Sequence, residues 1–388
     1  MNTNSFSPKS LLQRAGKKLC KISSDSQLMS ATSAEQVING KVQIPIELLR
    51  DTSGTLVVSL PTPRTYLREP FFVDSLVEPF NILKPEVKVV GEDKLLTHPV
   101  HYNEKDSRLT YTSIDDFIRK YTGVKITKKL GFIFHMSRCG STLATQMLAS
   151  NDKSFVLSEP TIINTILDPS LKIKSDKRIA LLNATVNALV SCSPVNCEQV
   201  FIKFRSWGAL YIDYILERFQ NTPWMFIHRY SLEVLQSVLE KPPGWLRCRK
   251  NYTKHFSGFL GVGENYTLSM SDDEYIARML GAFCRAARCA SLGRKIFIDY
   301  KELKSSLVTV AESLLGTSFN DSEVATMSSV SEIYSKDARK IQKFQPDSER
   351  KRAKATANQI NLTNEFAERE RLLLSKNIKH GNQHSKRI

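Results

Sequence analysis

The chain has 388 residues and a formal net charge of +16 at pH 7, from 55 lysines and arginines against 39 aspartates and glutamates. Hydrophobic residues make up 41% and charged residues 24%, a composition that excludes a fibrous or wholly disordered chain. Polar residues interrupt every apolar run well before the roughly 18 residues that a membrane-spanning helix needs, so we do not expect an integral membrane protein. The excess of positive charge indicates an anionic partner without identifying it.

Residues 1–32 form a basic N-terminal arm that has no acidic residue before Asp25. The arm lacks the apolar segment of a secretory signal, so we interpret it as a flexible, solvated arm, with a transit peptide as the alternative. The seven cysteines show no spacing typical of a metal site. We expect them to be reduced thiols, which favours a cytoplasmic location.

Residues 33–130 contain two β-like runs, at 42–46 and 55–60, and several prolines that interrupt the pattern. This texture predicts an irregular N-terminal subdomain of mixed structure.

From residue 131 onward, short apolar runs alternate with segments of helical period. The runs are nearly all apolar, as in parallel strands that are buried on both faces, and lie at 132–136, 155–157, 200–204, 224–227 and 296–298. The segments with apolar residues at helical spacing lie at 141–149, 176–189, 208–219, 232–239, 272–290 and 301–315. The alternation predicts an α/β domain over residues 131–320, with three layers and a central parallel sheet of about five strands.

Residues 321–388 are polar and basic, with a dense cluster of positive charge at 350–352. We predict a basic helical tail here. Such a cluster is typical of a solvated helix face, and the alternative is a cationic lid over an anionic ligand.

The segment Gly131-Phe-Ile-Phe-His-Met-Ser-Arg-Cys-Gly-Ser-Thr-Leu143 leads from a predicted strand into the start of a helix. The backbone N–H groups of residues 138–142, the positive end of the helix dipole and two hydroxyl groups can converge there on one tetrahedral anion. Aligned with the Walker A pattern, the segment has His135 in place of the first glycine and Ser141 in place of the lysine. A P-loop kinase, which needs that lysine, is therefore an alternative that the sequence disfavours.

The segment Ser137-Arg-Cys-Gly-Ser-Thr-Leu143 resembles the 5′-phosphosulfate-binding loop of sulfotransferases that use 3′-phosphoadenylyl sulfate (PAPS). A second segment, Phe226-Ile-His-Arg-Tyr-Ser-Leu-Glu-Val-Leu-Gln-Ser237, resembles the 3′-phosphate-binding element of that family. Both follow predicted strands, at the edge where open α/β sheets bind ligands. Three further segments resemble a bacterial sulfotransferase-like group: Arg68-Glu-Pro-Phe-Phe-Val-Asp-Ser75, Val156-Leu-Ser-Glu-Pro160 and Phe201-Ile-Lys-Phe204.

The resemblance implies the P-loop architecture, PAPS as co-substrate, no metal, and transfer of a sulfuryl group to an unidentified hydroxyl or amine acceptor. It assigns donor binding to two elements and to a lid formed by Lys336 and the cluster at 350–352. The fork of Arg229 suits a phosphate, and Ser237, two turns into the next helix, can add a hydroxyl to the same oxygens. The donor-binding residues so assigned are Arg138, Cys139, Gly140, Ser141, Thr142, Leu143, Arg229, Ser237 and Lys336.

The resemblance also implies three catalytic residues. Arg138 occupies the position of the catalytic cation beside the leaving 5′-phosphate, and Lys203 occupies that of a lysine contacting the sulfuryl oxygens. Some family members have a catalytic histidine two residues after this lysine, where this chain has Arg205. Glu159 is therefore our candidate for the general base.

Other readings of these segments remain open. We interpret His135 and His228 as buried structural histidines, while Cys139 at a helix start could have a lowered pKa and act as a nucleophile. Against that reading, Thr145 stands where a Cys-x5-Arg phosphatase has its arginine. A non-catalytic binding module is the remaining hypothesis, and nucleic acid is disfavoured as its ligand because aromatic residues near the basic runs are few.

Overall fold

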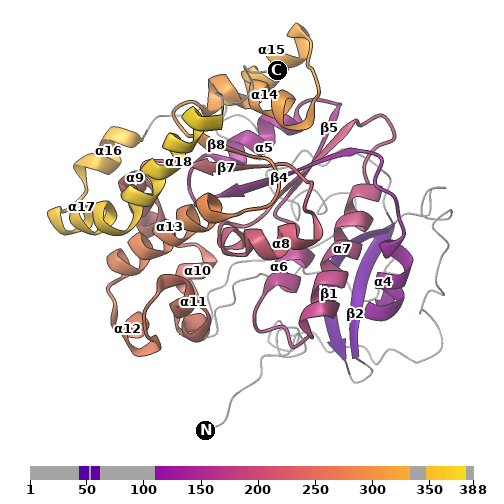
Figure 1. Cartoon of the computed structure of the whole chain (residues 1–388), viewed down its shortest axis with the longest axis horizontal. Helices are drawn as coiled ribbons and strands as arrows, with labels where there is room; N and C mark the ends of the chain where they lie inside the picture. Colours follow the sequence, from indigo (N-terminus) through magenta and orange to yellow (C-terminus); the bar gives the residue numbers. More distant parts are fainter. Residues whose placement is uncertain (1–42, 52–53, 62–109, 333–346, 382–388) are drawn as a thin grey trace.

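The computed structural model describes residues 43–51, 54–61, 110–332 and 347–381. The predicted arm at 1–32 and Lys336 lie outside these residues. At the centre of the described part is a five-stranded parallel sheet with helices on both faces (Figure 1). The predicted α/β fold with a central parallel sheet is thus confirmed.

The sheet has the strand order β5-β6-β4-β7-β8. Its strands are β4 (Lys129–His135), β5 (Ser154–Ser158), β6 (Gln199–Lys203), β7 (Trp224–His228) and β8 (Lys295–Asp299). Each coincides with a predicted apolar run to within three residues at either end. All residues of β5, β6 and β7 are buried, which explains why these runs carry no alternation of polar and apolar side chains.

The first strand of this sheet, β4, lies between β6 and β7. From β4 the chain passes to the edge strand β5, returns through β6, and then crosses to β7 on the other side of β4. The carboxyl ends of β4, β6 and β7 therefore meet where the strand order reverses. In open α/β sheets this is the position of the ligand crevice.

Two groups of helices cover the sheet. Helix α5 (Ser141–Ala149) contacts α14 (Leu303–Leu315) and α15 (Asp321–Ser329) above the sheet in Figure 1. Helices α7 (Ser175–Ser191), α8 (Ile212–Arg218) and α13 (Asp272–Cys289) lie below it. None of the helices that the structure describes is long and apolar enough to cross a membrane.

One predicted helix, at 208–219, is wrong in its form. The chain instead makes a 3₁₀ turn, η1 (Ser206–Tyr211), and then the short helix α8. Gly208 N–H donates to the carbonyl of Arg205, three residues earlier, which is the hydrogen bond of a 3₁₀ turn. A Cβ on Gly208 would lie 3.2 Å from the Cβ of Phe204, so the turn is tight at this point. The sequence pattern also missed short helices, namely α6 (Thr161–Leu167), α10 (Gly244–Arg247), α11 (Thr253–Leu260) and α12 (Glu264–Ser269).

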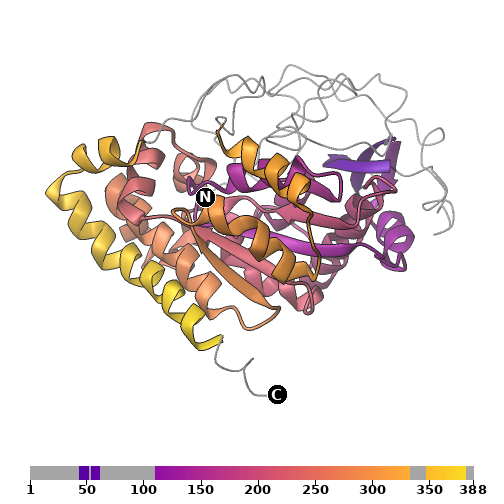
Figure 2. The same cartoon turned by 90° about the horizontal axis from the view of Figure 1, so that it is seen from above.

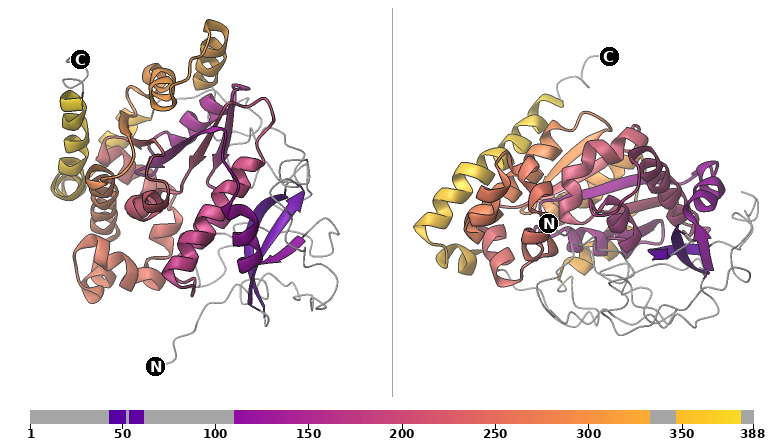
Figure 3. Two further views of the ribbon diagram at one scale, coloured as in Figure 1. Left: turned by 45° about the vertical axis from the view of Figure 1, so that its right-hand side comes forward. Right: turned by 90° about the horizontal axis from the view of Figure 1, so that it is seen from below.

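The described N-terminal residues form a separate antiparallel sheet of β1 (Gln43–Asp51), β2 (Gly54–Pro61) and β3 (Thr110–Ser113), followed by α4 (Ile114–Thr122). The predicted runs at 42–46 and 55–60 fall on β1 and β2. Strand β1 contacts α6 and α7, and α4 also lies against α7 (Figure 3). The apolar side chains of this sheet belong to the same buried core as those of the parallel sheet.

The described C-terminal residues are helical, as predicted. They form α16 (Ser348–Ala353), α17 (Ala357–Thr363), the π-helical turn η4 (Asn364–Glu368) and α18 (Arg369–Gly381). Helix α16 contacts α9 (Ser231–Glu240), while α17, η4 and α18 run along the outside of α13 (Figure 2). Gly281 permits the close approach, because a Cβ there would overlap the carbonyl oxygen of Phe366.

Candidate active site

The loop between β4 and α5 has an unusual backbone conformation at the start of a helix. Ser137, Arg138 and Gly140 have positive φ angles of 80°, 47° and 87°. Gly140 is the N-cap of α5 and supplies no side-chain cap, and the first turn of α5 contains no acidic residue. Positive φ costs energy at non-glycine residues, and such strain is concentrated at functional sites. The loop thus directs the positive end of α5 toward the carboxyl edge of the sheet.

Several hydrogen bonds tie this loop to the end of β7. The backbone N–H of Met136 donates to the carbonyl of Ile227 over 3.1 Å, and the N–H of Arg229 donates to Met136 Sδ over 3.1 Å. The Cys139 thiol donates to the same Ile227 carbonyl over 3.0 Å. The two segments that the sequence assigned to donor binding are therefore in direct contact.

Cys139 is a structural residue in this loop. Its side chain is completely buried, and burial raises the pKa of its thiol to about 12, although Arg229 and Lys203 act in the opposite direction. The lowered pKa considered from the sequence is therefore wrong, because desolvation outweighs the helix terminus and the nearby cations. Cys139 is not an activated nucleophile.

Glu159 and Lys203 meet at the ends of β5 and β6. Lys203 Nζ lies 3.0 Å from Glu159 Oε1, with the lysine side chain 0% and the glutamate side chain 19% exposed. Glu159 has a positive φ of 61°, and its N–H donates to the carbonyl of Lys203 over 2.8 Å, which extends the strand pairing by one residue. This strained backbone turns the carboxylate toward the lysine.

Two more basic groups surround the same carboxylate. His135 Nε2 lies 3.9 Å from Glu159 Oε1, and Arg205 Nε lies 3.7 Å from Glu159 Oε2. Burial by itself raises the pKa of Glu159, but Lys203, His135 and Arg205 together lower it to about 2. Glu159 is thus an ionised partner of Lys203. A carboxylate with this pKa is a weak base unless the lysine moves away.

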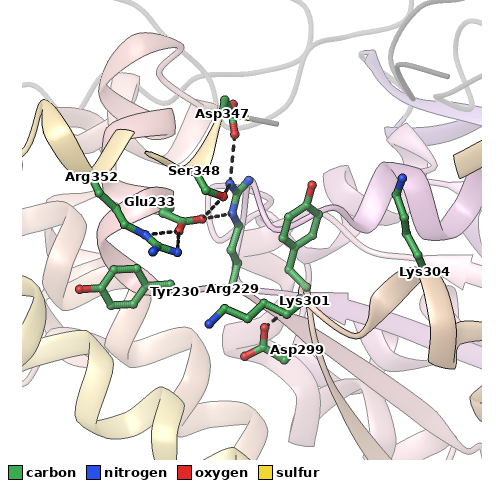
Figure 4. A pocket seen from close by; sticks show the side chains of 10 residues that line it. Arg229, Tyr230, Glu233, Asp299, Lys301, Lys304, Asp347, Ser348 and Arg352 are labelled. Carbon is green, nitrogen blue, oxygen red and sulfur yellow. Dashed lines mark hydrogen bonds and ion pairs between the residues drawn. The ribbon is translucent and has the colours of Figure 1, made fainter. Parts of the chain in front are cut away.

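Arg229 leaves the end of β7 and is buried with its charge paired. Its Nε donates to Glu233 Oε2 over 2.7 Å, and its Nη2 donates to Asp347 Oδ1 over 3.1 Å and to Ser348 Oγ over 3.0 Å (Figure 4). Burial acts to lower the pKa of this guanidinium, but the two acids raise it. The sequence identified Arg229, whereas Glu233, four residues later on the same helix face, could have been found from its i,i+4 spacing.

Tyr300, directly after β8, contacts both the β4–α5 loop and Arg229. Its ring lies 4.4 Å from the guanidinium carbon of Arg229, and a Cβ on Gly140 would lie 2.6 Å from the same ring. Only glycine fits at that position, both for the ring and for the backbone conformation. No pattern in the sequence indicated Tyr300, because its role depends on the meeting of three strand ends.

A cavity of about 220 Å³ opens beside Arg229 (Figure 4). Four basic, three acidic and two aromatic side chains line it together with one serine. They come from the β7–α9 connection, α9, the end of β8 and the turn after it, α14, and α16 with the residue before it: Arg229, Tyr230, Glu233, Asp299, Tyr300, Lys301, Lys304, Asp347, Ser348 and Arg352. Positive charge thus exceeds negative charge only slightly in this cavity.

The other predicted site residues are distributed around these elements. Ser141, Thr142 and Leu143 form the buried first turn of α5. Ser237 is buried on α9, where its hydroxyl donates to the carbonyl of Glu233 over 2.9 Å, and it does not line the cavity beside Arg229. Contact of Ser237 with a phosphate at Arg229 would need that hydroxyl to turn, so its assignment stays a prediction.

No protein-family model matches this sequence. No curated protein matches it either. A sulfotransferase from Mycobacterium avium is similar in structure over 55% of this chain and 71% of its own, with a TM-score of 0.36 and 11% sequence identity. The sulfotransferase domain from the curacin biosynthetic pathway is similar over 52% of this chain and 78% of its own, with a TM-score of 0.34 and 16% identity. Similarities this low carry no argument about function, which has to come from the residues of the site.

Proposed function

We propose that this chain is a sulfotransferase that transfers the sulfuryl group of PAPS to a hydroxyl or amine acceptor. One observation carries the proposal: the β4–α5 loop, with its uncapped helix start, lies directly against the Arg229 segment at the point where the strand order reverses. A nucleotide with a 5′-phosphosulfate and a 3′-phosphate needs two anion-binding elements within its own length. The free thiols of the described cysteines favour the reducing cytoplasm as its location.

The residues present fit such a donor in three respects. The start of α5 offers backbone N–H groups, Lys203 offers a buried ammonium group, and Arg229 offers a guanidinium group beside an open cavity. The fit to a nucleoside triphosphate is poorer, because Ser141 stands where a P-loop kinase has its lysine.

In the proposed reaction the S–O bond to the 5′-phosphate breaks while an S–O or S–N bond to the acceptor forms. Arg138 and the N–H groups of α5 stabilise the negative charge that develops on the leaving phosphate. Lys203 stabilises the oxygens of the group in transit. The proton of the acceptor passes to Glu159 and then to water.

The Glu159–Lys203 pair makes donor binding precede proton transfer. With Lys203 at 3.0 Å, Glu159 is held in its ionised form. When Lys203 turns toward the sulfuryl oxygens, Glu159 loses its nearest cation and its pKa rises toward the range of an effective base. The base is therefore activated only when a donor is bound.

The first test is binding of adenosine 3′,5′-bisphosphate, the product that PAPS would leave. Wild-type protein should gain melting temperature with the bisphosphate, by an amount equivalent to about 2.7 kcal/mol at a hundred times the dissociation constant. Arg229→Ala should abolish the gain, whereas Arg218→Ala, on the exposed side of α8, should retain it. No gain for the wild type, or a gain only with ATP and Mg²⁺, would contradict the proposal.

The acceptor is the part of the reaction that needs a direct search. Incubation with radiolabelled PAPS and a cell extract should label a small molecule, a glycan or a protein, and Glu159→Gln should suppress the label. Binding of the bisphosphate without any transfer would instead indicate a non-catalytic module.

A further inference from the structure

We infer that α16 is an inhibitory cap on Arg229, in which the carboxylate of Asp347 holds the place of an incoming phosphate. The identity of that phosphate rests on the proposed function, but the competition at Arg229 does not. Three observations support the cap: the contacts of Arg229, the way in which α16 is attached, and the firm attachment of the helices that follow it.

The first observation is that α16 and the residue before it take up the outer part of the Arg229 guanidinium. Asp347 Oδ1 and Ser348 Oγ both accept from Nη2, at 3.1 Å and 3.0 Å (Figure 4). Glu233 accepts from Nε, on the inner side. A phosphate entering the cavity meets Arg229 at Nη2, because Glu233 is buried beneath the guanidinium and Asp347 is 35% exposed in its side chain. Asp347 is therefore the partner that a phosphate would displace.

The second observation is that α16 is attached by charge. Its sequence, SERKRA, contains no large apolar side chain. Arg350 pairs with Glu240 over 2.6 Å, Lys354 pairs with Glu240 over 3.4 Å, and Arg352 Nε donates to Glu233 over 2.8 Å. These three basic side chains are about half exposed. The two pairs with Glu240, which is 37% exposed, are of the kind that salt screens and that contributes little stability, so they hold α16 weakly. The stronger contact is that of Arg352, because Glu233 is only 3% exposed.

The third observation is that the chain after α16 is anchored. Ala367 and Leu374 are completely buried, and the crossing at Gly281 packs η4 against α13. Arg371 Nη1 donates to Asp299 Oδ2 over 2.7 Å at the end of β8, with the arginine side chain only 10% exposed. Release of α16 would therefore leave α18 in place.

The charges of the cap determine its effect. Asp347 brings one negative charge to Arg229 and also pairs with Lys351, which is 4% exposed. A phosphate with two negative charges would form stronger charge-assisted hydrogen bonds with Arg229 than the single carboxylate of Asp347 does. Phosphate binds only to molecules in which the cap is open. Its apparent association constant is therefore the intrinsic constant multiplied by the fraction of open molecules.

The test compares two variants that remove the same charge from adjacent places. Asp347→Asn removes the competing carboxylate, and Glu349→Gln removes an exposed carboxylate two residues later on α16. By calorimetry, Asp347→Asn should bind adenosine 3′,5′-bisphosphate about two- to fivefold more tightly than wild type, the gain expected from removing one partly exposed charged competitor. Glu349→Gln should match the wild type. Equal or weaker binding by Asp347→Asn would overturn the cap.

Hydrogen exchange measures the opening of α16 directly and independently of the affinity for the bisphosphate. Saturating bisphosphate should speed exchange of the amides of residues 348–353 in the wild type and leave those of α18 unchanged. Slower exchange at 348–353 would show α16 to be a lid that closes on the ligand, and would overturn the inhibitory cap.

A further experiment distinguishes failure of the proposed function from failure of the cap. If the bisphosphate does not bind to any variant, inorganic phosphate at millimolar concentration replaces it as the probe of Arg229. Faster exchange at 348–353 with phosphate, and at lower phosphate concentration in Asp347→Asn, would uphold the cap and reject the sulfotransferase. No effect of phosphate on either variant would overturn the cap.

Discussion

The ring of Tyr300 lies 4.4 Å from the guanidinium carbon of Arg229 and closes at the same time against Gly140. A cation over an aromatic face is stabilised electrostatically, more so where water is excluded. Tyr300 thus packs between Arg229 and Gly140 of the β4–α5 loop. Its ring adds a side-chain contact to the hydrogen bonds that already join these two segments.

We predict that Gly140→Ala destabilises the protein by about 2–4 kcal/mol, the sum of a positive-φ cost and of overlap with the Tyr300 ring. The double variant Gly140→Ala/Tyr300→Ala should lose less unfolding free energy than the sum of the two single losses. The difference should be at least about 1 kcal/mol, because removing the ring removes the overlap. Urea unfolding of the four proteins measures this coupling. Tyr300→Phe keeps the ring and is the control: it should give no such coupling.

We predict strong coupling between Glu159 and Lys203. Lys203→Met should cost about 2–4 kcal/mol because it leaves the mostly buried carboxylate of Glu159 without its nearest cation, and adding Glu159→Gln should recover part of that loss. The exposed pair of Arg350 and Glu240 is the matched control, with an expected coupling below about 1 kcal/mol. Additive effects of the Glu159 and Lys203 variants would show that the pair contributes no net interaction.

The Glu159–Lys203 pair also sets a pH dependence at low pH. The pKa of Glu159 is about 2 in the folded protein and near its ordinary value of 4.5 in the unfolded chain, so the unfolded chain binds the proton first. The stability that this group contributes is therefore complete above pH 4.5 and is lost as the pH falls through 2. Glu159→Gln should lack this loss in unfolding experiments between these values.

Two buried histidines should cause a further loss of stability on acidification, in a pH range above that of Glu159. Burial lowers the pKa of His228 to about 4, with Asp299 opposing the shift, and burial together with Arg178 lowers the pKa of His255 to about 4. The unfolded chain takes up these protons near pH 6.5, before the folded protein does, so stability should fall as the pH drops from 6.5 to 4. The expected loss is about 1–3 kcal/mol for each histidine.

His255→Gln separates the two histidine contributions. This variant should keep the loss that belongs to His228 and show a smaller total loss between pH 6.5 and 4 in urea unfolding. A pH dependence identical to that of the wild type would mean that His255 titrates alike in the folded and unfolded chains.

Much of the central fold could be predicted from local pattern. The five strands appear as short apolar runs because each is buried in a parallel sheet, and a strand buried on both faces needs apolar side chains at nearly every position. The 3₁₀ turn η1 and the short helices α10 to α12 could not be predicted in this way. Elements of four to eight residues contain too few turns for a period to emerge, and packing against neighbours decides their form.

In the candidate site, too, some residues could be found from the sequence and others only from the structure. Arg138 and Arg229 were singled out because the segments that carry them resemble donor-binding elements of sulfotransferases, and because both segments follow apolar runs. The partners of these residues were not. Asp347 contacts Arg229 across 118 positions of the chain, and Tyr300 meets Gly140 only because β8 and β4 end at the same edge.

The +16 charge counted from the sequence indicated an anionic partner but did not show which cations are available to bind it. Composition and periodicity indicated the strands of the sheet, and the motifs before α5 and around Arg229 could be read from the sequence, since all these features depend on neighbours along the chain. Tertiary structure alone decided that Glu159 is held by Lys203 and that Arg229 is covered by Asp347. Ionic pairing depends on distances in space, and the path of the chain brings these charges within about 3 Å of one another.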